Sequence, residues 1–118
     1  MGAIHSSDFF QVDELPGKVV RVARLSRPFT SQADVDQACE PVQRALDRLG
    51  RSQHALLLDA RRARGSNDPD HEAWFAAHRA KMLLGFRRVA ILLRTVIGVM
   101  HSDRLTRTDG TRGAVEIF

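Results

Sequence analysis

The sequence has little of what several classes of protein require. Cys39 is the only cysteine among the 118 residues, so no disulfide can form within the chain. No apolar run exceeds the five residues of Val89–Leu93, whereas a membrane-spanning helix needs about 20. Residues 1–6 lack the charged start and the apolar stretch of a secretory signal. We therefore expect a protein without a membrane span that works in the reducing cytoplasm.

Lysine is also scarce. Only Lys18 and Lys81 are lysines among the 18 basic residues, and the others are arginines. The net charge of +4 is ordinary for a small domain. No dense basic stripe with interleaved aromatic residues accompanies this charge, so we expect no nucleic-acid partner.

The chain contains no self-sufficient catalytic motif. His71 and His78 are seven residues apart, which is not the H-E-x-x-H spacing, and a metal site needs three or four ligands. No G-x-S-x-G turn is present to expose a nucleophilic serine. The sequence therefore favours a protein that is not an enzyme and that needs no metal or other cofactor.

What remains is an ordinary globular composition, with 43% hydrophobic and 27% charged residues. A chain of 118 residues falls within the range of about 100–200 residues for one domain. We expect a single domain over residues 1–118, with residues 1–7 flexible.

An amphipathic helix is predicted over residues 33–49, where apolar residues recur at helical spacing. Thr30 or Ser31 can cap its start, and Gly50 can adopt the left-handed conformation that ends it. Pro41 removes one backbone hydrogen bond, so we expect a bend beside it.

The other segments alternate between strand and helix patterns. A Pro-Gly pair predicts a hairpin turn between two Phe- and Val-rich runs, and Asn67 or Asp68 followed by Pro69 predicts a helix start. The resulting order, ββαβαβαβ, predicts an α/β fold with a mixed sheet and helices packed on it. The expected strands cover 8–14, 18–25, 55–58, 89–93 and 114–118, and the expected helices cover 33–49, 69–84 and 95–105.

Three stretches carry a resemblance to a known family. They are LLLDAR over 56–61, FRRVAILLRT over 86–95, and Gly98 followed by Arg104 and Leu105. Together they resemble the bacterial SpoIIAA-like group of the STAS superfamily, over residues 19–118. The resemblance implies the architecture shared by anti-sigma-factor antagonists and Sec14-type lipid carriers. It also implies a non-enzymatic module that binds a partner protein, although some members bind nucleotides or lipids.

Two departures from that family limit the comparison. Anti-sigma-factor antagonists carry a phosphorylated serine after an aspartate in the loop that follows the central strand, and Ser66 only approximates that position. The family also commonly ends with a helix, for which no residues follow the last expected strand. Either a partner subunit covers that face of the sheet or the helix is absent.

Ligands of parallel sheets gather at the carboxyl ends of the strands, here the loops after Asp59 and after Arg94. Arginines in these loops can hold a phosphate or another anion, with Ser66 as the phosphorylation candidate. The plainer interpretation, which the sequence favours, is that Asp59 pairs with one arginine while Ser66 and Asn67 make turn and cap hydrogen bonds. The candidate residues are Asp59, Arg61, Arg62, Arg64, Ser66, Asn67, Arg94, Thr95, His101 and Arg104.

A second hypothesis starts from Val96, Ile97 and Met100, which crowd one short segment. They can close an apolar pocket, form a dimer contact or simply pack in the core. The sequence favours a homodimeric protein-interaction module whose binding edge comprises residues 60–68 and 94–104. The alternative is a small apolar-ligand or lipid carrier, which requires a closed apolar cavity of several hundred Å³.

Overall fold

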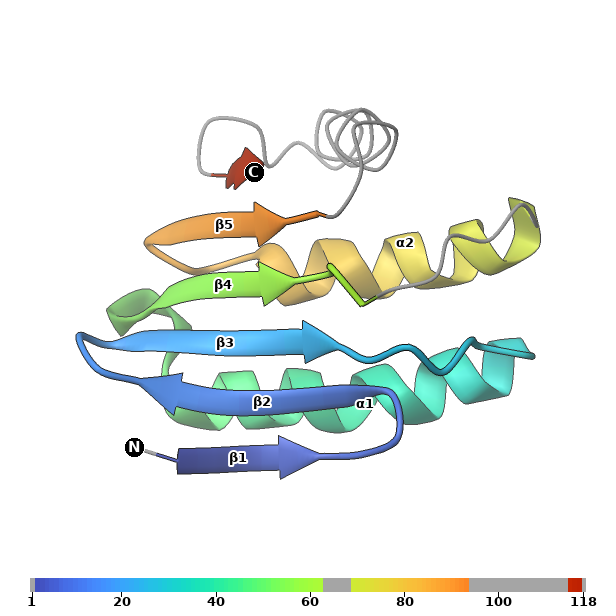
Figure 1. The fold of residues 1–118 in the computed structure, drawn as a ribbon. Helices are drawn as coiled ribbons and strands as arrows, with labels where there is room; N and C mark the ends of the chain where they lie inside the picture. Colours follow the sequence, from blue (N-terminus) through green and yellow to red (C-terminus); the bar gives the residue numbers. More distant parts are fainter. Residues whose placement is uncertain (1, 63–68, 94–114, 118) are drawn as a thin grey trace.

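The computed structural model of the chain describes residues 2–62, 69–93 and 115–117. They form a six-stranded sheet with the strand order β1-β2-β3-β4-β5-β6 and two α-helices (Figure 1). The strands are β1 (Gly2–Ser6), β2 (Phe10–Leu15), β3 (Val19–Arg24), β4 (Ala55–Asp59), β5 (Arg88–Leu92) and β6 (Val115–Ile117). The helices are α1 (Gln32–Leu49) and α2 (Pro69–Leu83), with a single 3₁₀ turn at Arg51–Gln53.

The sheet is mixed, as the sequence predicts. Strands β1, β2 and β3 are antiparallel neighbours, and β3, β4, β5 and β6 run parallel to one another. The hairpin between β2 and β3 turns through Gly17 and Lys18, which both have positive φ angles of 82° and 59°. The α/β class is therefore confirmed. The helix expected over 95–105 lies outside the described residues.

The first strand departs from the expected order. Residues 1–7 are expected to be flexible, yet Gly2–Ser6 pair with β2 as an antiparallel strand. Ser7 makes the connecting turn, because its Oγ accepts hydrogen bonds from the amides of Phe9 and Phe10 at 3.3 and 3.1 Å. The described chain therefore begins with three strands where the sequence predicts two.

Helix α1 begins one residue before the predicted start and ends at the predicted residue, Leu49. The Ser31 Oγ accepts a hydrogen bond from the amide of Asp34 at 3.1 Å. Of the two candidates, Thr30 and Ser31, it is therefore Ser31 that caps the helix. Gly50 ends the helix with φ 95°. The helix continues through Pro41 without a break, and the bend beside that residue stays a prediction.

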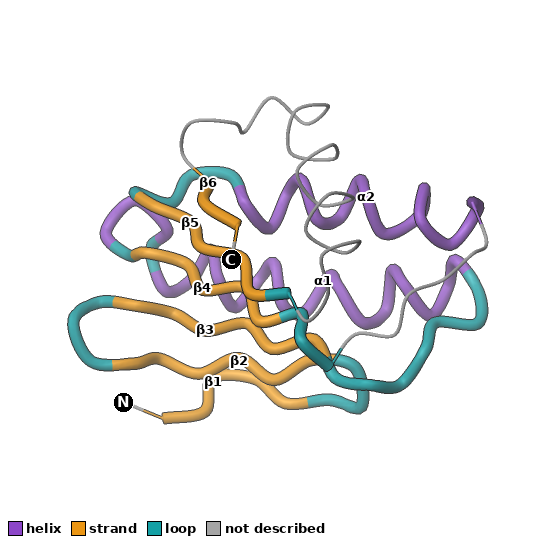
Figure 2. The backbone as a smooth tube through the Cα atoms, turned by 45° about the horizontal axis from the view of Figure 1, so that its top comes forward, coloured by secondary structure: helices purple, strands orange, loops and turns teal. Residues whose placement is uncertain are grey.

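Both helices lie side by side on one face of the sheet (Figures 1 and 2). Alternate strand residues point towards them, which produces the core and leaves residues such as Asp13, Arg21 and Leu57 on the other face. The core residues are Phe10, Val12, Val20, Val22, Val35, Ala38, Cys39, Val42, Leu46, Leu56, Leu58, Met82, Leu83, Phe86, Val89 and Ile91. Neither described helix is long and apolar enough to cross a membrane.

Candidate functional site

The described part of the candidate site lies where β3 and β4 end. Because these strands are parallel and in register, with Ala23 opposite Asp59, their carboxyl ends meet at one edge of the sheet. The turn before β2 reaches the same edge, since β2 is antiparallel to β3. We call residues 7–10, 24–31 and 59–62 together the carboxyl edge.

Asp59 is the centre of an ion-pair network at this edge. It is the last residue of β4 and only 4% exposed. Its Oδ1 accepts hydrogen bonds from the Nε and the amide of Arg61, at 2.9 and 3.2 Å. Its Oδ2 accepts from Nη2 of both Arg61 and Arg21, each at 2.8 Å. The hydrogen bonds from Arg61 and then Arg21 hold the pKa of the Asp59 carboxyl well below its usual range, so it is ionised at neutral pH.

Arg21 is a member of the network that sequence reasoning misses. It stands on β3, opposite Leu57 of β4, and its Nη1 lies 4.0 Å from Asp13 on β2. The network therefore crosses three neighbouring strands on the face away from the helices. The signal is present in the sequence, because an arginine between the inward-facing Val20 and Val22 must point to the opposite face.

Arg61 is both anchored and accessible. Its guanidinium binds Asp59 through two nitrogens, and its side chain is nevertheless 57% exposed. The pKa of Arg61 is raised by its hydrogen bonds to the Asp59 carboxylate, so the cation is favoured further. Arg62 follows directly and is exposed. Two adjacent cations thus stand at the carboxyl edge, and the first of them is held in a fixed position.

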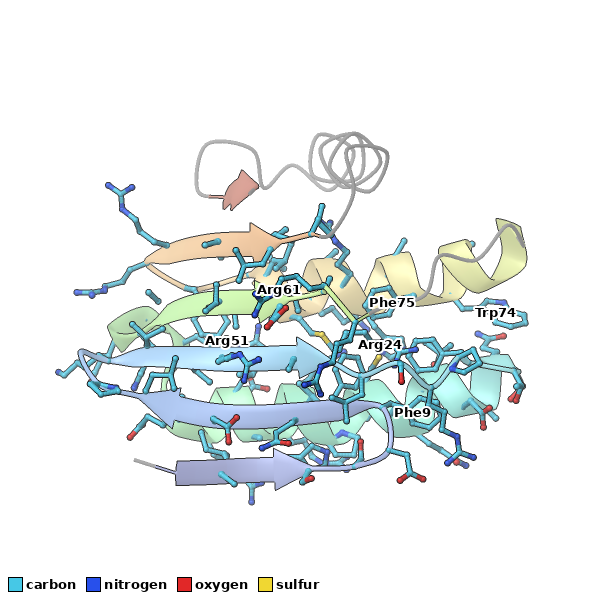
Figure 3. All side chains as sticks on the ribbon, in the orientation of Figure 1. Phe9, Arg24, Arg51, Arg61, Trp74 and Phe75 are labelled. Carbon is cyan, nitrogen blue, oxygen red and sulfur yellow. The ribbon has the colours of Figure 1, made fainter. Side chains whose placement is uncertain are left out.

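A cluster of aromatic rings lies at the same end of the sheet, against Arg24 and Arg27. Phe9 stacks on Phe29 with ring centroids 5.1 Å apart, and Phe29 lies 5.8 Å from Phe75 of α2. Phe75 also stacks on the fully buried Phe10 at 6.4 Å. Phe9, Phe29, Phe75 and the neighbouring Trp74 are only partly buried against the core. Figure 3 labels three of them, Phe9, Phe75 and Trp74. Half-buried aromatic side chains and arginines are enriched at protein interfaces.

Arg24 lies beneath this aromatic cluster and has a structural role. It is 8% exposed, and its guanidinium carbon is 4.1 Å from the centroid of the Phe29 ring. It donates to the carbonyls of Phe9 at 3.1 Å, Leu25 at 2.7 Å and Arg27 at 2.7 Å. Burial lowers the pKa of Arg24 to about 10, which leaves it charged at neutral pH. The loop before α1 is thereby fixed against β2.

Several predicted residues lie outside the described part of the chain. Of the residues expected in the anion site, the structure describes Asp59, Arg61 and Arg62, and it brings all three to one edge. Asp59 pairs with Arg61, as the plainer interpretation expects, and with Arg21 in addition. The residues outside the described ranges are Arg64, Ser66, Asn67, Arg94, Thr95, Val96, Ile97, Met100, His101 and Arg104.

Two other reactive side chains of the described residues, Cys39 and His78, are inaccessible or engaged. Cys39 is fully buried, and burial raises the pKa of its thiol to about 12, so it is not a thiolate at neutral pH. His78 of α2 lies 2.7 Å from Asp36 and 2.8 Å from Gln43, both on α1, so both ring nitrogens have partners. No cluster of three potential metal ligands occurs within the described ranges.

No family model, no curated protein and no solved structure matches the chain. The features that point to a function are therefore the anchored pair of Asp59 and Arg61 and the residues around it. The resemblance to the SpoIIAA-like group stays a prediction from the sequence.

Proposed function

We propose that the chain is a STAS-like, non-enzymatic interaction module of the cytoplasm that binds a partner protein at its carboxyl edge. The observation that carries the proposal is the position of Arg61, which a buried carboxylate holds while more than half of its side chain faces solvent. The resemblance of residues 56–61 to the SpoIIAA-like group points to the same class of function.

The anchoring of Arg61 by Asp59 lowers the free-energy cost of binding a partner. Immobilising a flexible side chain on binding costs about 0.5–1.5 kcal/mol, and a side chain that is already held in place avoids most of that cost. Arginine also presents a planar fork of donors, of which Asp59 engages one side, through Nε and Nη2. Its Nη1 makes no hydrogen bond with another described residue, which leaves this nitrogen for the proposed partner.

The proposed partner presents an acidic or phosphorylated segment. Arg61 and the exposed Arg62 favour a carboxylate or a phosphate through charge-assisted hydrogen bonds. The partly buried rings of Phe9 and Phe29 add apolar area at the same edge. An interface with arginine and aromatic side chains at its centre has the composition of known binding hot spots.

The test is a quantitative affinity capture of lysate proteins with the tagged chain. Arg61→Ala/Arg62→Ala removes two adjacent exposed arginines at the carboxyl edge. The matched control, Arg87→Ala/Arg88→Ala, removes another adjacent exposed pair, located at the opposite end of the sheet where β5 begins. A thermal melt accompanies both variants.

The proposal predicts that one or more proteins captured by the wild type are lost with Arg61→Ala/Arg62→Ala and kept with the control. Both variants should melt close to the wild type, because the substituted arginines are exposed and the buried Asp59 keeps its ion pair with Arg21 at 2.8 Å. Equal capture by the two variants would contradict the proposal. So would a loss of capture that simply follows a loss of folded protein.

A further inference from the structure

A second surface lies at the opposite corner of the molecule, at the edge strand β1. Here an open groove of about 590 Å³ runs between β1 and the last turns of α1. Its apolar wall consists of Ala3, Ile4, Ala45 and Leu49, and its charged groups are Glu14 and Arg48. None of these residues belongs to the carboxyl edge.

Ile4 stands out within this groove. It is 36% exposed, and only Leu84 joins it among the large hydrophobic residues that are exposed in the described ranges. The pairing of β1 with β2 skips Ile4, because the register shifts between Ala3 and His5. Such a bulge redirects the side chain and hinders the addition of another strand at the sheet edge. A partner at this edge is therefore expected to pack against side chains in the groove.

The two charged groups of the groove are accessible and of opposite sign. Glu14 pairs with Gly2 across the β1–β2 ladder, and a glycine has no side chain to cover the carboxylate, which is 34% exposed. Its one ion-pair contact within the described residues is with His54, at 3.6 Å. Arg48 is exposed in the last turn of α1 and makes no ion pair with any residue that the structure describes.

This pattern is self-complementary. In a two-fold symmetric contact the same patch lies on both copies. If one residue of the first copy contacts a second residue on the other copy, the reverse contact is made as well. A patch with one accessible acid, one accessible base and the exposed apolar side chain of Ile4 fulfils this requirement. A partner of a single charge would match only half of it.

We propose that a second copy of this chain occupies the groove. Ile4 of each copy packs against Leu49 of the other, and Arg48 of each copy pairs with Glu14 of the other. The contact is small beside the roughly 800 Å² per partner of a standard interface, so the dimer is weak and reversible. This inference is independent of the function proposed for the carboxyl edge.

The test is sedimentation velocity of the purified protein from micromolar to millimolar concentration. The wild type should show a reversible monomer–dimer equilibrium. Ile4→Glu and Arg48→Glu should each weaken the dimer by about 10-fold or more. The matched control Leu84→Glu changes the other exposed large hydrophobic residue, outside the groove, and should dimerise as the wild type does.

A charge swap gives the decisive comparison. Glu14→Arg/Arg48→Glu restores opposite charges across the two-fold axis and should recover most of the affinity lost in Arg48→Glu. Circular dichroism and a thermal melt verify that each variant is folded. A wild type that stays monomeric throughout, a dimer that is insensitive to Ile4→Glu, or a charge swap that recovers nothing would each overturn the proposal. A small apolar ligand bound in the groove of a monomer, detected by native mass spectrometry, would overturn it as well.

Discussion

Two arginines at opposite ends of the sheet each donate hydrogen bonds to three backbone carbonyls. The three carbonyls bound by Arg24 lie at the carboxyl edge, and its guanidinium lies against the Phe29 ring. Arg51 donates hydrogen bonds to the carbonyls of residues 81, 82 and 84 at the end of α2. Its guanidinium carbon lies 5.5 Å from the centroid of the Phe86 ring. Figure 3 shows both. Arg51 also keeps an exposed carboxylate, Asp47, at 2.8 Å.

Arg61 completes the comparison, because it binds a buried carboxylate instead of carbonyls and remains exposed. An arginine whose donors all point into the backbone stabilises the fold. An arginine that is fixed on one side and open on the other is available to a partner. Substitutions at these positions should separate the two roles.

Arg24→Ala should destabilise the fold most. It leaves the carbonyls of Phe9, Leu25 and Arg27 without this donor and removes the cation from the Phe29 ring. We expect a loss of about 3 kcal/mol in the free energy of unfolding, measured by urea denaturation. Arg24→Lys keeps the charge but not the fork of donors and should recover less than half of the loss. A value for Arg24→Ala within about 1 kcal/mol of the wild type would refute this account.

Arg51→Ala should cost less, about 2 kcal/mol, because the carbonyls at the end of a helix are more easily reached by water. The side chain of Arg51 is 14% exposed, and its Nη1 lies 3.0 Å from the Leu84 carbonyl and 3.3 Å from that of Met82. Hydrogen exchange should show faster opening in the last turn of α2 than in β3. Uniform loss of protection over the whole chain would contradict a local capping role.

Asp59→Asn should have a smaller effect that depends on pH. The pKa of Asp59 is lower in the folded protein than the value of about 3.9 in an unfolded chain. Its ionisation therefore stabilises the fold above about pH 5, and this stabilisation is lost as the pH falls below 4. We expect a difference of about 1 kcal/mol between wild type and Asp59→Asn at pH 7. Denaturation curves at several pH values should show that difference shrinking towards pH 3.

The Cys39 thiol of the folded protein should react only very slowly with a thiol reagent. Because burial raises the pKa of its thiol to about 12, Ellman's reagent at pH 8 should label it only as fast as the protein unfolds. The labelling rate with and without urea measures this. Rapid labelling of the folded protein would show that the thiol is accessible.

The sequence predicts most of the described elements because their signals are local. The Pro-Gly pair marks the hairpin of β2 and β3, and Ser31 and Gly50 bracket α1. Strand β1 escapes prediction because Gly2–Ser6 have no alternating pattern and depend on pairing with β2. In the candidate site, too, contacts between residues close in sequence are predictable and contacts between distant residues are not.

Asp59 and Arg61 are two residues apart, so their proximity at the end of a strand is predictable. Arg21 lies 38 residues from Asp59 in sequence and joins it only through the parallel register of β3 and β4. The role of Arg24 depends on backbone carbonyls on both sides of β3, at residues 9, 25 and 27, which no side-chain pattern records. Such contacts become visible only in three dimensions.

The most direct test of the central claim, that an anchored Arg61 is the binding group, is capture of the partner by Asp59→Asn under conditions in which the variant is folded. The substitution removes a negative charge from the edge and also frees Arg61. If the fixed position of Arg61 carries recognition, capture should fall although the edge has become more positive. If capture stays unchanged or rises, net charge alone attracts the partner, and the role assigned to the Asp59–Arg61 pair is contradicted.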